Sequence, residues 1–117
     1  MDKYTPTGVS VNKSAKKIFI NWKDGHSSVY PFGGLRKSCP CVFCQGGHEA
    51  MGKDIDPIVF LTDTSERLDI ANIKQSGNYA IQIFWNDGHN TGIYRWEYLR
   101  KGCPVEAGIL PPEKDGN

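Results

Sequence analysis

Residues 18–26 read IFINWKDGH and residues 81–89 read IQIFWNDGH, so one stretch of sequence occurs twice in this chain. The two isoleucines, the tryptophan and the final Asp-Gly-His are identical at a constant offset. Isoleucine, isoleucine and tryptophan occupy every second position, which predicts a strand with one buried face. The Asp-Gly pair then predicts a two-residue type I′ turn, because that turn needs positive φ at both central positions. The two stretches therefore predict two β-hairpins of one kind.

The similarity continues beyond each predicted turn. After one inserted residue, Tyr30 corresponds to Tyr94, and residues 35–40 (LRKSCP) correspond to residues 99–104 (LRKGCP). The second strand of each hairpin is expected at residues 27–30 and 90–94. A short helix should follow, most clearly at residues 96–101, where basic residues occupy the last turn and a glycine stands at the C-cap. The first helix is weaker, because residues 31–34 contain two glycines.

A further strand is expected before each hairpin, at residues 7–12 and 68–75. Since one copy cannot bury its own apolar side, the two copies should pack face to face. The fold class predicted is α+β, a mostly antiparallel sheet built from two copies of a hairpin-plus-short-helix unit, with a structural zinc site. One domain should span residues 1–110, and residues 111–117 should form a disordered tail.

The composition excludes several classes of partner. The chain has 117 residues, with 14 basic and 13 acidic side chains, so it lacks the charge excess that nucleic acid or an anionic membrane attracts. No apolar run reaches the roughly 18 residues of a membrane helix, and the N-terminus has no apolar signal-peptide region. We therefore expect a cytoplasmic protein with reduced cysteines, in which a metal site is favoured over disulfides.

Three of the four cysteines, Cys39, Cys41 and Cys44, fall within six residues as C-x-C-x2-C. Thiolates that converge on one metal ion lie this close, whereas buried structural thiols rarely do. A tetrahedral site needs a fourth ligand. Spacing alone favours His48, and the other candidates are His26, His89 and Cys103, which stands at the position equivalent to Cys39.

The order of motifs resembles a known family. W-x-D-G-H, L-R, C-P-C-x-x-C, G-N-Y-A, W-x-D-G-H and L-R follow one another between residues 7 and 104. This order is similar to the N-terminal domain of gamma-butyrobetaine hydroxylase, and closer still to the small stand-alone bacterial proteins named after that domain. The resemblance implies one Zn²⁺ ion held by Cys39, Cys41, Cys44 and His89, ahead of His48 and Cys103. Such a metal would join the two halves of the fold.

The same resemblance argues against an enzyme. In the hydroxylase, the oxygenase chemistry belongs to a separate C-terminal domain, whose iron site uses an H-x-D/E motif. Here the histidines occur as His26-Ser-Ser, His48-Glu-Ala and His89-Asn-Thr. P-loop, nucleophile-elbow and dinucleotide motifs are also absent. A nucleophile pair of Cys103 with His26 has no support in the local sequence.

We therefore expect a small zinc-binding accessory or interaction domain without its own catalytic centre. Its partner would be an unknown protein, such as an oxygenase or an iron–sulfur carrier, contacted by exposed aromatics among Tyr30, Tyr94, Trp96 and Tyr98. For Trp96, as for the other two tryptophans, periodicity favours the core instead. The alternative is an iron–sulfur or metallocluster-related accessory protein of Mrp-type carrier ATPases, because a similar domain is appended to some of them and thiolates suit such clusters.

Overall fold

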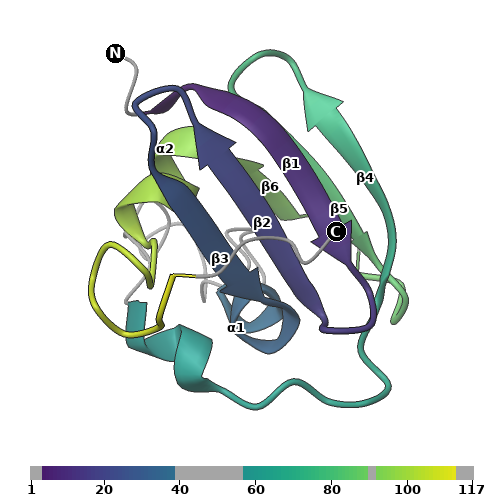
Figure 1. Ribbon diagram of the computed structural model, residues 1–117. Coiled ribbons are helices and arrows are strands. Elements are labelled where there is room, and N and C mark those ends of the chain that lie inside the picture. The colour runs from purple at the N-terminus through teal and green to yellow at the C-terminus, as the bar shows by residue number, and fades with distance from the viewer. Residues whose placement is uncertain (1–3, 39–56, 90–91, 113–117) are drawn as a thin grey trace, which may run out of the picture.

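The computed structural model describes residues 4–38, 57–89 and 92–112. These residues form two three-stranded antiparallel sheets, and each sheet is followed by a six-residue helix (Figure 1). In chain order the elements are β1 (Pro6–Asn12), β2 (Lys17–Trp22), β3 (Ser27–Pro31), α1 (Phe32–Lys37), the 3₁₀ helix η3 (Pro57–Leu61), β4 (Ile70–Ser76), β5 (Ala80–Trp85), β6 (Gly92–Arg95) and α2 (Trp96–Lys101). The α+β class and the antiparallel pairing are confirmed.

The core lies between the two sheets. Alternate residues of the central strands β2 and β5 face it, as period-2 alternation predicts, and they are at most 4 % exposed: Ile18, Ile20, Trp22, Ile81, Ile83 and Trp85. Phe32 and Leu35 of α1 and Trp96 and Leu99 of α2 join the same cluster. The expectation that the three tryptophans are buried is therefore confirmed.

The hairpin turns differ from the prediction. Gly25 and Gly88 have φ of 92° and 88°, but neither Asp24 nor Asp87 has a positive φ, so the turns are not type I′. In the first hairpin, the Gly25 N–H donates to the Trp22 carbonyl at 3.0 Å, and the Trp22 N–H donates to the carbonyl of His26 at 2.8 Å. This is a three-residue connection in which a turn ends in a left-handed glycine. The longer loop displays the aspartate and the histidine toward the other half.

The two glycines of α1 reflect packing rather than a weaker helix, since α1 is as long as α2. A Cβ on Gly34 would stand 2.6 Å from a ring carbon of Phe60, and one on Gly33 would stand 2.8 Å from the Asp63 carbonyl oxygen. The close neighbours are η3, where the sequence left open a strand or a docked segment, and the residues that follow it. η3 docks through Phe60, which is 2 % exposed and packs edge-on against Tyr30.

Most of the aromatic residues proposed for partner contact are buried. Tyr30 and Tyr94 are fully buried, so that prediction is wrong for these two, and Trp96 is 6 % exposed, as its periodicity predicted. Tyr98 is half-buried, and its hydroxyl donates to the Ser38 carbonyl at 2.6 Å. Tyr79 is the aromatic that the described chain exposes, at 51 %.

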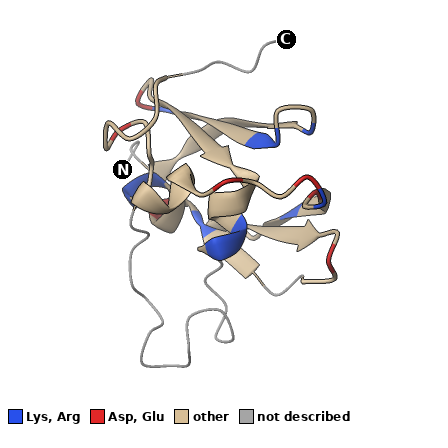
Figure 2. Cartoon of the chain, turned by 90° about the horizontal axis from the view of Figure 1, so that it is seen from below, with Lys and Arg blue, Asp and Glu red and all other residues tan. Residues whose placement is uncertain are grey.

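Charged residues are interspersed over strands, loops and helices (Figure 2). None of the helices in the described residues is long and apolar enough to cross a membrane. Pro111 and Pro112, at the start of the predicted tail, are exposed, and residues 113–117 lie outside the described residues.

Candidate functional site

Two buried tyrosines hold the halves together. The Tyr30 hydroxyl of β3 donates to the carbonyl of Leu99 in α2, and the Tyr94 hydroxyl of β6 donates to the carbonyl of Leu35 in α1, each at 2.6 Å. Carbonyls in the last turn of a helix have no partner within the helix, so each tyrosine satisfies one of them. Burial raises the pKa of Tyr30 well above its ordinary value, which keeps this hydroxyl protonated as a donor. Each helix end is thereby fixed to the sheet of the other half.

The arginine that follows each of these leucines reaches an aspartate of the opposite hairpin loop. Arg100 is 4 % exposed, and its two terminal nitrogens contact both carboxylate oxygens of Asp24 at 3.1 and 2.9 Å. It also contacts Glu106 at 2.8 Å and lies over the Trp22 ring, 5.5 Å from the centroid. Arg36, the equivalent residue of α1, is 28 % exposed and contacts Asp87 at 3.1 Å. The Arg100 site is thus more buried and makes the two-pronged contact.

These contacts shift the ionisation of the groups involved. Hydrogen bonds from Arg100 and from the backbone N–H of His26 lower the pKa of Asp24 from 3.8 to about 2. Burial works against the charged form of Arg100, but its hydrogen bonds to Asp24 and Glu106 raise its pKa above the ordinary value. Burial likewise opposes ionisation of Asp87, yet hydrogen bonds from the His89 N–H and Arg36 lower its pKa.

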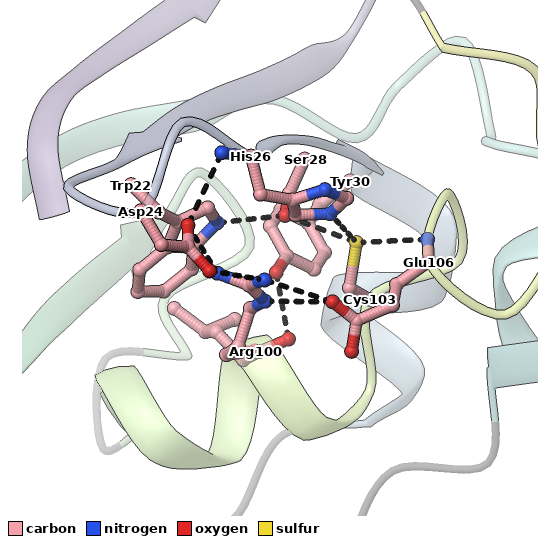
Figure 3. A network of polar contacts seen from close by, with 9 residues as sticks. Trp22, Asp24, His26, Ser28, Tyr30, Arg100, Cys103 and Glu106 are labelled. Carbon is pink, nitrogen blue, oxygen red and sulfur yellow. Dashed lines mark hydrogen bonds and ion pairs between the residues drawn. The ribbon is translucent and has the colours of Figure 1, made fainter. Parts of the chain in front are cut away.

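Beside Arg100, three polar groups converge on the sulfur of Cys103 (Figure 3). Cys103 follows the end of α2 and is 1 % exposed. Its Sγ lies 3.0 Å from Ser28 Oγ and 3.2 Å from His26 Nε2, and it accepts the backbone N–H of Glu106 at 3.4 Å. Cys103 is a buried thiol at a helix end, one of the two roles that the sequence left open for it, and its role as a metal ligand is not tested because the other cysteines lie outside the described residues. The local sequence around either residue does not predict that His26 lies this close to Cys103.

The hairpin loop fixes His26 in this place. Its backbone N–H donates to Asp24 Oδ1 at 3.1 Å, and its carbonyl accepts the N–H of Trp22 at 2.8 Å. The indole N–H of Trp22 donates to Ser28 Oγ at 2.8 Å, so Ser28 links the tryptophan to the Cys103 sulfur. The backbone of His26 is therefore fixed on both sides, and its side chain is half-buried.

The second half repeats the loop but not all of its contacts. The His89 N–H donates to Asp87 Oδ1 at 3.0 Å, and the His89 carbonyl accepts the N–H of Trp85 at 3.0 Å, as in the first half. The buried indole N–H of Trp85, however, has no acceptor within the described residues. Gly92 occupies the position equivalent to Ser28, so the hydroxyl that serves Trp22 is missing there.

The predicted metal ligands fall mostly outside the described residues. Cys39, Cys41, Cys44 and the alternative ligand His48 all lie in residues 39–56, while His89 is described and half-buried. Within the described parts of the chain, no group of three or more His, Cys, Asp or Glu side chains could hold a metal ion. The four-ligand zinc site stays a prediction.

Sequence reasoning missed the Arg100–Asp24 contact that crosses between the halves, and it named the pair of Cys103 with His26 without finding local support for it. Arg100 and Asp24 are separated by 76 residues, and Cys103 and His26 by 77. A signal was nonetheless present, because each half carries both an L-R pair and a D-G-H loop. Two equivalent units that pack face to face can exchange such contacts in both directions.

Comparisons with known proteins place the chain among relatives whose activity is not known. The family model described as gamma-butyrobetaine hydroxylase-like, N-terminal, matches residues 9–100. A crystal structure of a protein of unknown function from Acidithiobacillus ferrooxidans, a DUF971 family member, is 29 % identical with a TM-score of 0.64, and the match covers 86 % of this chain and 93 % of that chain. No curated protein matches this chain.

Two solution NMR structures are also similar. They are 21 % and 19 % identical, with TM-scores of 0.64 and 0.60. Each match covers 90 % of this chain, and 73 % and 77 % of the respective structures. At these identities the likeness shows the fold alone.

Proposed function

This chain belongs to the gamma-butyrobetaine hydroxylase-like, N-terminal family, and from that premise we propose that it is a zinc-binding accessory domain whose metal is structural. The proposed ligands are Cys39, Cys41, Cys44 and His89. Three closely spaced thiolates and one imidazole form a standard closed zinc site, which leaves no open position for a substrate. Because the cysteines belong to the first half and His89 to the second, the metal would connect the two halves of a small core.

The contacts between helix ends and hairpin loops support His89 as the fourth ligand. Arg100, near the end of α2, holds Asp24 of the first hairpin loop. Arg36, near the end of α1, contacts Asp87 of the second hairpin loop. Each loop histidine comes two residues after its aspartate and follows the same backbone hydrogen-bond pattern. The loop that faces the end of α1 is therefore the one that carries His89.

The contact between the first hairpin loop and the end of α2, which lies within the described residues, supplies the geometry by analogy. There the loop histidine, His26, reaches the sulfur of Cys103, the second residue after α2. In the sequence, Cys39 is likewise the second residue after α1. An equivalent arrangement would bring His89 to the first cysteine of the C-x-C-x2-C segment. This correspondence carries the proposal, and it favours His89 over His48.

We further propose that the domain has no catalytic centre and acts through an unidentified protein partner. The H-x-D/E pattern of an oxygenase iron site is absent from all three histidines. Basic and acidic side chains are nearly equal in number, which favours a protein over nucleic acid or a membrane. The exposed ring of Tyr79, with the Arg95 guanidinium 5.9 Å from its centroid, offers the pair of residue types most enriched at protein interfaces.

Metal content and the visible spectrum of the purified protein test the metal assignment. We expect a colourless protein with one zinc ion per chain. A brown protein that absorbs at about 400 nm and contains iron would replace zinc by an iron–sulfur centre, for which the three thiolates are also suited.

A histidine series tests the ligand assignment. We expect His89→Ala to weaken zinc binding by more than about 100-fold, because even groups that only support a metal ligand are worth about 10–100-fold. His26→Ala, the matched change in the other half, should leave zinc binding unchanged, and so should His48→Ala. Loss of zinc from the His48→Ala protein alone would show that the ligand set is wrong.

A further inference from the structure

We propose that Cys103 is a site of oxidative modification, at which a small peroxide is the oxidant and His26 acts as the base. The sulfur lies within hydrogen-bond distance of His26, Ser28 and the N–H of Glu106. A thiol carries one hydrogen, and a backbone N–H can only donate. At least two of these three groups must therefore donate to the sulfur, which acts mainly as a hydrogen-bond acceptor.

The position of His26 meets the geometric requirement for a base. Its Nε2 lies 3.2 Å from the sulfur, the separation at which an imidazole can remove a proton from a nucleophile. The loop holds the histidine through Asp24 Oδ1 and the N–H of Trp22. Neither His26 nor Cys103 belongs to the proposed zinc site, so the test of this proposal does not depend on the identity of the metal ligands.

A short turn lies against the sulfur, with the Glu106 N–H 3.4 Å from it. The N–H of Ala107 donates to the carbonyl of Cys103 at 3.1 Å, and residues 106–108 are exposed. The side chain of Glu106, which is 41 % exposed, ties this turn to Arg100. Because Cys103 is only 1 % exposed, the reagent must be small. Peroxides meet the size requirement, whereas bulky disulfide reagents do not.

The proposed step is a two-electron oxidation. The sulfur of Cys103 attacks one peroxide oxygen, a sulfur–oxygen bond forms, and the oxygen–oxygen bond breaks. His26 takes the thiol proton and gives it to the departing oxygen, which leaves as water from hydrogen peroxide or as an alcohol from an alkyl hydroperoxide. Cys103 becomes a sulfenic acid and the peroxide is reduced.

Trypsin separates this cysteine from the other three, which makes the test specific. Cleavage after Lys101 and Lys114 gives the peptide 102–114, which contains Cys103 alone, whereas Cys39, Cys41 and Cys44 fall in the peptide 38–53. Zinc-loaded protein is exposed to hydrogen peroxide, quenched with catalase, and unfolded in urea with dimedone and iodoacetamide. Mass spectrometry of peptide 102–114 then counts sulfenic acid against unreacted thiol.

We expect Cys103 to oxidise at least about tenfold faster in the native protein than in the urea-unfolded chain at pH 7, since a positioned base supplies about 100-fold or more. His26→Gln should remove most of this advantage, while Ser27→Ala, a change at the next residue along the chain, should keep it. Native oxidation no faster than that of the unfolded chain would overturn the proposal, and so would an unchanged rate in a folded His26→Gln protein.

The pH dependence of the wild-type rate covers the case in which His26→Gln does not fold. An unassisted thiol loses about tenfold in rate per pH unit below its ordinary pKa of about 8.5. With His26 as base, the native rate should fall less steeply than this between about pH 8 and pH 7, and the unfolded chain provides the reference slope. Parallel slopes for the native and unfolded protein would contradict the role of the histidine.

Discussion

The loop of residues 22–26 and the loop of residues 85–89 have the same backbone contacts but different surroundings. In the first, Arg100 is buried and contacts two carboxylates, and Ser28 accepts the indole N–H of Trp22. In the second, Arg36 is partly exposed, and the indole N–H of Trp85 lacks an acceptor among the described residues. Similar local sequence thus gives similar local backbone, while an arginine of the opposite half and the presence or absence of Ser28 in the same half decide how the polar groups are satisfied.

The arginine pairs offer the largest test of this difference. Replacing Arg100 with Met should lower the free energy of unfolding by about 2–3 kcal/mol, between the values typical of exposed and of fully buried pairs. The equivalent change Arg36→Met should cost less than about 1 kcal/mol, because this pair is more exposed to solvent. Urea unfolding of both zinc-loaded variants measures the two values.

Equal costs for the two arginine changes would show that the burial of Arg100 adds nothing to its contacts. The different surroundings of the two arginines would then have no effect on stability. Because both substitutions remove the same charge and keep an unbranched side chain, their difference isolates the surroundings.

A smaller effect is expected from Ser28→Ala, which makes the first half resemble the second. The indole N–H of Trp22 then loses its acceptor, and the cost should be about 1–2 kcal/mol, as for other buried donors left without a partner. Ser27→Ala is the matched control, since its hydroxyl bonds the side chain of Asn21 at an exposed position. A change of less than about 0.5 kcal/mol for Ser28→Ala would mean that Trp22 tolerates the loss as Trp85 does.

The smallest effect is expected in the pH dependence of the melting temperature, where the two aspartates should differ. The folded pKa of Asp24 is about 2, below its ordinary value of 3.8, so its contribution to stability is present above pH 3.8 and is lost as the pH falls toward 2. Asp24→Asn should therefore flatten the decline of the melting temperature between these pH values. Asp87→Asn acts in the same direction through a lowered pKa. A larger flattening from Asp87→Asn than from Asp24→Asn would contradict the expectation that Asp24 contributes more to stability than Asp87.

Much of the fold follows from local pattern. The alternation in β2 and β5 identified the buried faces, and the helix at residues 96–101 was predicted with its bounds. The turn type was wrong, because Asp-Gly also suits a three-residue loop in which only the glycine has positive φ. The two glycines of α1 were wrongly taken to predict a weaker helix, since they allow the close approach of Phe60 to Gly34 and of Asp63 to Gly33, which no local rule contains.

The sequence by itself determined the elements, their buried faces and the cysteine spacing that predicts a metal, because these depend on side-chain periodicity and on neighbours a few residues away. Only the tertiary structure decided which loop meets which helix end. The pairing of Cys103 with His26 spans 77 residues and arises from packing two units against each other. Contacts of that kind depend on how the apolar faces of the two halves pack together, so the sequence of either half alone does not predict them.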